Sequence, residues 1–217
     1  MTWLRDKAVA GILCGVLPFA AAAEDVRILA LGDSLTQGYG LIEDNGFVPQ
    51  LDAWLAAQGA EVAVINGGVS GDTSAGGAAR VEWSLTPDVD AMIVTLGGND
   101  LLRGIEPSVT RENIETILRA AQEKSVEVLL VGMQAPGNYG PEYKQDFDSL
   151  YPELAEDYDT LYADSFFVGL GTSDPAEARD YFQADGIHPN AAGVRKIVEG
   201  LGPKVIDLIE RVDEPGA

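Results

Sequence analysis

Apolar runs typical of buried strands alternate with helix-like patterns along almost the whole chain of 217 residues. Strands are predicted at 26–31, 61–66, 91–96, 126–131 and, more weakly, at 166–168. Helices are predicted at 47–58, from about 75 to 85, from a cap at Thr110 to about 124, and from 190 to about 212. Because such alternation favours a parallel sheet covered on both faces, we expect a three-layer α/β/α sandwich with about five strands.

The first 23 residues have the pattern of a targeting segment. Arg5 and Lys7 precede an uncharged apolar run over 8–19, and four alanines ending at Ala23 follow it. This is typical of a cleaved signal peptide, and the run is too short to span a membrane. We therefore predict cleavage after Ala23 and a periplasmic or secreted protein without stable membrane insertion. An uncleaved anchor is the less favoured alternative, because no second apolar segment follows.

Residues 24–217 are expected to form a single domain that is strongly acidic. The chain carries a net charge of −21, and loss of Arg5, Asp6 and Lys7, together +1, leaves −22. This charge argues against nucleic-acid binding and against docking on anionic lipid. Cleavage also removes Cys14, the only cysteine, so neither a disulfide nor thiol chemistry is expected.

A serine, an aspartate and a histidine are placed in the sequence as a catalytic triad requires. His188 is the only histidine, Asp185 lies three residues before it, and Ser34 follows the first predicted strand. Neutral imidazole is the usual base that activates a serine hydroxyl. We therefore predict Ser34 as nucleophile, His188 as base and Asp185 as the group that orients it. The alternatives are a histidine in a capped turn before a helix that starts at Pro189, and a serine that only caps a helix.

Two further strand ends carry candidate donors for an oxyanion. Gly71 follows the second strand, and its backbone N–H can approach a ligand closely. Asn99 follows the third strand after two glycines and presents an uncharged amide donor. With the N–H of Ser34, these groups are expected to converge at one sheet edge. An ordinary loop at Gly71 and an Asx-turn at Asn99 remain the alternatives.

Taken together, these blocks resemble those of the SGNH (GDSL-type) hydrolase family. They are Gly32-Asp33-Ser34-Leu35, Gly71, Gly97-Gly98-Asn99-Asp100 and Asp185-x-x-His188-Pro189. The resemblance implies a flavodoxin-like sandwich, the triad above and an oxyanion hole of Ser34, Gly71 and Asn99. Longer strings resemble the exported bacterial branch with arylesterase, thioesterase and lysophospholipase activities. In that branch the loop at Asn138, Tyr139 and Gly140 tends to form a movable wall of the acyl pocket.

The resemblance implies a serine esterase that forms an acyl-enzyme and acts on aryl and short or medium acyl esters, with thioesters and lysophospholipids as further substrates. No cofactor or metal is expected, since one histidine without a Cys/His cluster cannot build a common zinc site. The partner is a small ester or lipid-derived molecule, and the oligomeric state stays open. Two alternatives remain: a carbohydrate O-acetyl esterase on the same fold, and a non-catalytic ligand-binding protein.

Charge in the segment 136–158 leads to one further expectation. This segment is predicted as a surface loop and a short helix that wall the pocket. Lys144 is the nearby cation in this segment. The carboxylates are Glu142, Asp146, Asp148, Glu153, Glu156 and Asp157. If they face the pocket mouth, neutral esters are expected to be better substrates than the anionic acyl-CoA.

Overall fold

A computed structural model describes residues 26–171 and 175–213, which contain one parallel sheet. Its strands are β1 (Val26–Gly32), β2 (Val62–Gly68), β3 (Ala91–Thr95), β4 (Glu127–Val131) and β5 (Leu161–Ala163). They pair in the order β2-β1-β3-β4-β5, with every neighbouring pair parallel. The predicted five-stranded α/β/α sandwich is confirmed.

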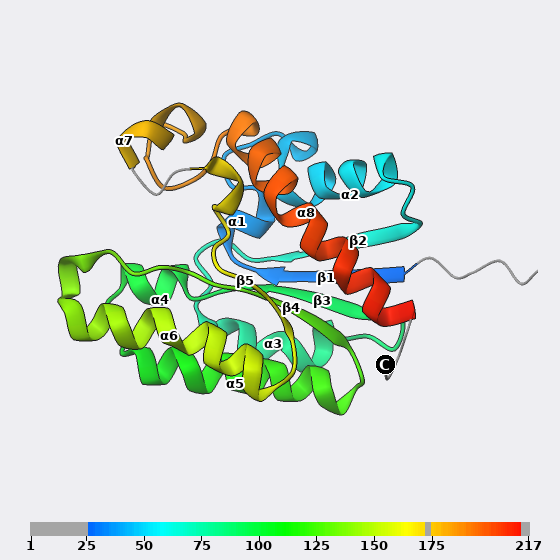
Figure 1. The fold of residues 1–217 in the computed structure, drawn as a ribbon, viewed down its shortest axis with the longest axis horizontal. Helices are drawn as coiled ribbons and strands as arrows, with labels where there is room; N and C mark the ends of the chain where they lie inside the picture. Colours follow the sequence, from blue (N-terminus) through cyan, green and yellow to red (C-terminus); the bar gives the residue numbers. More distant parts are fainter. Residues whose placement is uncertain (1–25, 172–174, 214–217) are drawn as a thin grey trace, which may run out of the picture.

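Long helices cover both faces of the sheet (Figure 1). The helices α2 (Phe47–Ala57) and α8 (Ala191–Asp213) lie on one face, and α3 (Ser74–Ser84), α5 (Pro107–Glu123) and α6 (Pro141–Asp157) lie on the other. Shorter segments connect these layers: α1 (Ser34–Gln37), η1 (Glu43–Asn45), α4 (Gly98–Leu102), η2 (Gly137–Tyr139), η3 (Val168–Leu170), α7 (Pro175–Ala178) and η4 (Arg179–Tyr181).

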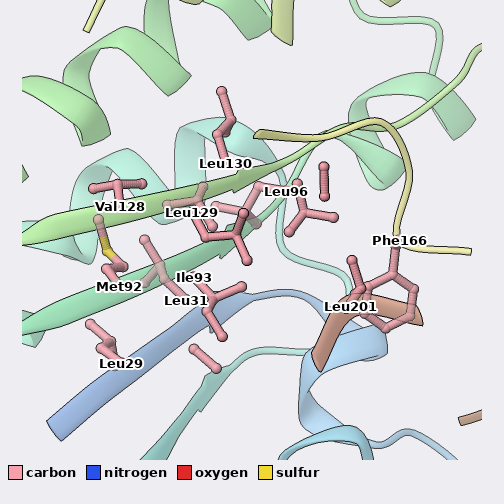
Figure 2. Packing of buried hydrophobic residues seen from close by; sticks show 14 of the residues in the cluster. Leu29, Leu31, Met92, Ile93, Leu96, Val128, Leu129, Leu130, Phe166 and Leu201 are labelled. Carbon is pink, nitrogen blue, oxygen red and sulfur yellow. The ribbon is translucent and has the colours of Figure 1, made fainter. Parts of the chain in front are cut away.

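The central strands read as continuous apolar runs because helices bury both of their faces. All five residues of β3 are buried, as are the last five of β1. Figure 2 shows part of the resulting cluster, with Leu29 and Leu31 of β1 beside Met92 and Ile93 of β3. This rigid core fixes the loops that leave the strand ends.

The predicted fifth strand was wrong in position. The sheet takes Leu161–Ala163, whereas Phe166 lies beyond a turn and is fully buried, with its ring 5.1 Å from that of Phe47. Residues 168–170 form the 3-10 helix η3. The aromatic run thus fills the core from a loop rather than pairing in the sheet.

Two helix predictions also need correction. The helix α5 begins at Pro107, so Thr110 does not cap it but lies buried inside it. The segment predicted as a loop with a short helix is mostly the 17-residue helix α6, which accommodates Pro152. Its buried residues recur at helical spacing and hold it against the core. They are Phe147, Leu150, Tyr151, Leu154 and Ala155.

The predicted signal peptide, with Cys14, lies outside the described residues. Within 26–171 and 175–213, no helix is long and apolar enough to cross a membrane.

The strand order reverses between β1 and β3, which pair directly although β2 comes between them in the sequence. In open parallel sheets a crevice forms at this reversal, beyond the carboxyl ends of the strands. The loops after β1 and β3 carry Ser34 and Asn99. The topology therefore brings these two predicted site residues together.

A buried carboxylate ties three helices together on one side of this crevice. Asp100 of α4 is fully buried and accepts hydrogen bonds from the backbone N–H of Ser74 (2.8 Å), from the Ser74 hydroxyl and from the Thr110 hydroxyl (3.2 Å). The Ser74 hydroxyl in turn accepts from Asn113. Because a buried charge needs several such donors, the network fixes α4 against α3 and α5.

We expect Asp100→Ala to lower the free energy of unfolding by about 3 kcal/mol, because it leaves buried donors on Ser74 and Thr110 without acceptors. Urea unfolding followed by circular dichroism measures this loss. Glu112→Ala removes an exposed carboxylate from α5 and should change the value by less than about 0.5 kcal/mol. A loss for Asp100→Ala no larger than that of Glu112→Ala would contradict the structural role of the network.

Candidate active site

A cleft of about 1660 Å³ lies at the carboxyl ends of the strands and gathers the predicted residues. Its walls include Ser34, Gly71, Asn99, Asp185 and His188, which are far apart in the sequence. Apolar side chains line much of the rest: Leu35, Leu101, Leu102, Met133, Phe167, Val168, Leu170, Phe182 and Ile187. The predicted convergence on one rim is confirmed.

Ser34 is the first residue of α1, and its hydroxyl is not used as a helix cap. Asp33 is the N-cap, and its Oδ1 accepts the backbone N–H of Leu35 at 3.0 Å. The Ser34 side chain is therefore available to the cleft. Its own N–H belongs to the first turn, where backbone donors have no acceptor within the helix.

The three predicted triad residues form a continuous chain of hydrogen bonds. The Nε2 of His188 lies 2.9 Å from the Ser34 Oγ, across 154 positions of sequence. Its Nδ1 lies 2.7 Å from Oδ2 of Asp185. The imidazole is mostly shielded, with 17% of its side chain exposed, whereas the Asp185 side chain is 37% exposed.

Asp185 is held in its ionised form by three donors. The His188 side chain, followed by the backbone N–H groups of His188 and Ile187, lowers the pKa of Asp185 to about 2. The two N–H groups lie 3.0 and 2.9 Å from Oδ1. Because an ionised carboxylate can only accept, Nδ1 carries a proton, and Nε2 is the ring nitrogen that faces the hydroxyl of Ser34.

The backbone at Gly71 has the conformation of a type II turn. The N–H of Asp72 donates to the carbonyl of Val69 at 3.0 Å, and Gly71 has φ of +80°. That third turn position favours glycine, because a side chain strains the left-handed conformation. A guanidinium nitrogen of Arg103 holds the Gly71 carbonyl at 2.7 Å. The turn and this contact fix the peptide that lines the cleft.

The Asn99 amide is oriented by Asp33. One N–H of Asn99 donates to Oδ2 of Asp33 at 3.0 Å, so the second N–H of the same amide is free to face the cleft. Burial raises the pKa of Asp33, and the hydrogen bonds from Leu35 and Asn99 partly offset this. One buried carboxyl group therefore caps the helix of Ser34 and holds the side chain of Asn99.

Tyrosines of α6 support the segment that carries Asn99. The hydroxyl of Tyr151 donates to the carbonyl of Leu96 at 3.0 Å, and that of Tyr143 donates to the carbonyl of Ile105 at 2.8 Å. Gly97, at φ of +106°, leaves room for Tyr151, since a Cβ there would lie 2.0 Å from its hydroxyl. The helix thus anchors both ends of this segment.

The structure does not bring Asn138, Tyr139 and Gly140 into the lining of the cleft. Pro136 and Gly137 line it instead, and the Tyr139 ring packs 4.9 Å from that of Tyr143. Their contact with substrate therefore stays a prediction.

The six carboxylates predicted near the pocket mouth are also not among the lining residues, although Lys144 is. Lys144 is paired with Asp148 at 2.6 Å, and Glu153 is paired with Arg111. The premise of an acidic pocket mouth formed by this segment is not supported.

Sequence reasoning missed the residues that position the predicted ones. The roles of Asp33 toward Asn99 and of Arg103 toward Gly71 depend on loops that meet only in the folded chain. Tyr39 lies five residues after Ser34, but no sequence pattern indicates that its ring packs on His188. In the part of the chain that the structure describes, no group of three or more His, Cys, Asp or Glu side chains could hold a metal ion.

Comparison with known proteins shows one consistent family. Residues 30–196 match the profile of the GDSL-like Lipase/Acylhydrolase family. The chain is 36% identical to Esterase TesA of Pseudomonas aeruginosa over 207 residues, covering 95% of this chain and 100% of that protein. It is 37% identical to Thioesterase 1/protease 1/lysophospholipase L1 of Escherichia coli over 196 residues, covering 89% of each.

Further relatives agree with this family. Arylesterase of Vibrio mimicus is 32% identical over 190 residues, covering 86% of this chain and 92% of that protein. The crystal structure of AlinE4, an SGNH-hydrolase family esterase, is similar with a TM-score of 0.70 and 39% identity, covering 86% of this chain and 98% of that one.

We expect His188→Ala to raise the pKa of Asp185 towards the ordinary value of 3.8, because it removes the largest cause of the depression. Carbon-detected NMR titration of the carboxyl group measures this shift, and Ser34→Ala, which keeps the imidazole, is the matched control. An unchanged pKa in His188→Ala would contradict the contact. Because the folded-state pKa is depressed, this stabilising contribution is present above about pH 4 and is lost as pH falls through about 2.

Proposed function

The chain belongs to the GDSL-like lipase/acylhydrolase family and is a hydrolase of ester bonds, and on this premise we propose that it is a serine esterase working through an acyl-enzyme. The observation that carries the proposal is the hydrogen-bonded chain from Ser34 through His188 to Asp185. A hydroxyl, an imidazole and an ionised carboxylate in that order match the arrangement that nucleophilic attack by a serine requires.

In acylation, the Oγ of Ser34 forms a bond to the carbonyl carbon of the ester while its proton passes to Nε2 of His188. The carbonyl oxygen becomes an oxyanion, which the N–H groups of Ser34 and Gly71 and the amide of Asn99 stabilise. The carbon–oxygen bond to the leaving group then breaks, and His188 returns the proton to the departing oxygen. Asp185 keeps Nδ1 protonated and stabilises the imidazolium between these steps.

In deacylation, water takes the place of the alcohol. His188 accepts a proton from water as its oxygen attacks the acyl carbon, and then returns a proton to Ser34 as the acyl–serine bond breaks. The product is a free carboxylic acid, and each step balances without a cofactor.

The substrates we propose are aryl esters and esters of short or medium acyl chains, with thioesters and lysophospholipids as further substrates. Leu101, Leu102 and Met133 offer hydrocarbon to an acyl chain on the walls of the cleft. A relative named Arylesterase and another named Thioesterase 1/protease 1/lysophospholipase L1 support this range. An apolar cleft of this size favours such substrates over the acetyl groups of carbohydrates.

We also propose that the protein is exported and works as residues 24–217 after cleavage behind Ala23. The charged, apolar and small-residue order of the first 23 residues supports export.

We expect Ser34→Ala to abolish both ester turnover and labelling by a fluorophosphonate probe, because only an activated serine hydroxyl reacts with that phosphorus centre. Purified wild type and variant are compared by p-nitrophenyl butyrate hydrolysis and by intact-protein mass spectrometry. Ser70→Ala is a matched control, since Ser70 also lines the cleft but its hydroxyl donates to Gln37. Ser70→Ala should keep labelling and turnover. Labelling that persists in Ser34→Ala would place the nucleophile elsewhere.

We expect Asn99→Ala to lower kcat by about 10²–10³ with little change in KM, because one oxyanion donor is lost in the transition state only. Steady-state kinetics with p-nitrophenyl esters measure this split. Asp33→Asn leaves one acceptor oxygen for two donors, the amide of Asn99 and the backbone N–H of Leu35, but keeps the Asn99 amide itself, so it should lose less than Asn99→Ala. An effect of Asn99→Ala mainly on KM would make Asn99 a substrate-binding residue instead.

A further inference from the structure

The chemistry of the proposed reaction fixes where the leaving group must lie. His188 accepts the proton of Ser34 and gives it to the departing oxygen, so that oxygen lies within hydrogen-bond reach of Nε2. The alcohol part of the ester therefore occupies the part of the cleft next to the imidazole. The acyl part extends away from it, beyond the carbonyl carbon.

An aromatic side chain lies next to the imidazole in that part of the cleft. The ring of Tyr39 lies with its centroid 4.5 Å from that of His188, at an interplanar angle of 36°. Tyr39 lines the cleft, yet 50% of it is exposed, as is 46% of Ile187 on the adjacent loop. About half of this large aromatic residue thus stays uncovered beside the point where the alcohol must lie, although burying its apolar surface would be favourable.

Backbone contacts through one glutamine hold Tyr39 and His188 together. The side-chain nitrogen of Gln183 donates to the carbonyl of Tyr39 at 2.8 Å and to that of Pro189 at 3.0 Å. The backbone N–H of Gln183 donates to the carbonyl of His188 at 2.8 Å. Tyr39 is therefore fixed relative to the catalytic imidazole before any substrate binds, which lowers the entropy cost of binding against it.

A second aromatic side chain borders the same region. Phe182 lines the cleft, pairs with Pro189 in an isolated antiparallel bridge, and has its ring 5.6 Å from that of Phe167. The part of the cleft next to His188 thus presents aromatic and aliphatic side chains, beside the polar Gln183 and Asp185 of the same loop. Such a surface favours a flat apolar group over a charged or strongly hydrated one.

From this arrangement we propose that Tyr39, with Ile187 and Phe182, forms a binding site for a flat aromatic leaving group, and that Tyr39 selects aryl esters over alkyl esters of the same size. This proposal rests on the proposed function and adds to it the residues that bind the alcohol part and a preference for aryl over alkyl esters. During acylation the Oγ of Ser34 forms a bond to the acyl carbon and the bond from that carbon to the phenolic oxygen breaks. The proton from Ser34 reaches the phenolate oxygen through His188, and the phenol leaves past Tyr39.

Phenyl acetate and cyclohexyl acetate test this site, because they share an acyl group and a six-carbon ring but only one ring is flat. The quantity measured is the ratio of the two kcat/KM values, because kcat/KM reports acylation. The ratio of each variant is compared with that of wild type, so that the difference in intrinsic reactivity between the two esters cancels. Tyr39→Ala should lower the phenyl-to-cyclohexyl ratio by about 3- to 10-fold, the size expected for loss of one ring contact. Tyr39→Phe keeps the ring and should keep the ratio.

Ile42→Ala is the matched control, because Ile42 is 70% exposed in the segment after α1 but does not line the cleft. Its ratio should equal that of wild type. A ratio unchanged in Tyr39→Ala, with both substrates slowed equally, would overturn the proposal and leave Tyr39 as a support for His188. A phenyl-to-cyclohexyl ratio that falls as far in Tyr39→Phe as in Tyr39→Ala would also overturn the proposal. Failure of the proposed function looks different, because wild type would then hydrolyse neither ester and Ser34 would not label.

Discussion

The buried carboxyl group of Asp33 connects the two loops on which this site depends. Its Oδ1 caps the short helix that begins with Ser34, and its Oδ2 holds the amide of Asn99 at the end of β3. The two loops are neighbours because β1 and β3 pair directly at the reversal of strand order. Burial raises the pKa of this group, and the donors from both loops partly offset that effect. Ser34 and the amide of Asn99, the proposed nucleophile and oxyanion donor, are thereby positioned by one side chain.

Much of the fold could be predicted from local pattern. Four of the five strands are apolar runs that end in glycine or polar residues, and burial on both faces explains these runs in β1, β3 and β4. The fifth strand is only three residues long, and it was predicted too far along the chain. The more apolar segment at Phe166 attracted the prediction, although Phe166 fills the core from a loop. Helix α6 was underestimated, since glycines and prolines at its start and Pro152 inside it obscure a buried face that only the packed structure defines.

The candidate site was predictable where chemistry restricts the choice. A single histidine, with an aspartate three residues before it, leaves few ways to activate Ser34, and the structure places the three side chains in hydrogen-bond contact. What could not be predicted are contacts between loops distant in sequence. Arg103 reaches the carbonyl of Gly71 across 32 positions, and Tyr39 packs on His188 across a far longer separation. No local periodicity in the sequence indicates such pairs of residues.

The central claim, that Ser34 attacks while three donors receive the oxyanion, is tested most directly by a crystal structure of the protein inactivated with an alkyl phosphonate. The phosphonyl oxygen takes the place of the oxyanion in such an adduct. We predict a bond from the Ser34 Oγ to phosphorus, and that oxygen within about 2.7–3.1 Å of the N–H groups of Ser34 and Gly71 and of the Asn99 amide. An adduct on another residue, or an oxygen that contacts none of these donors, would contradict it.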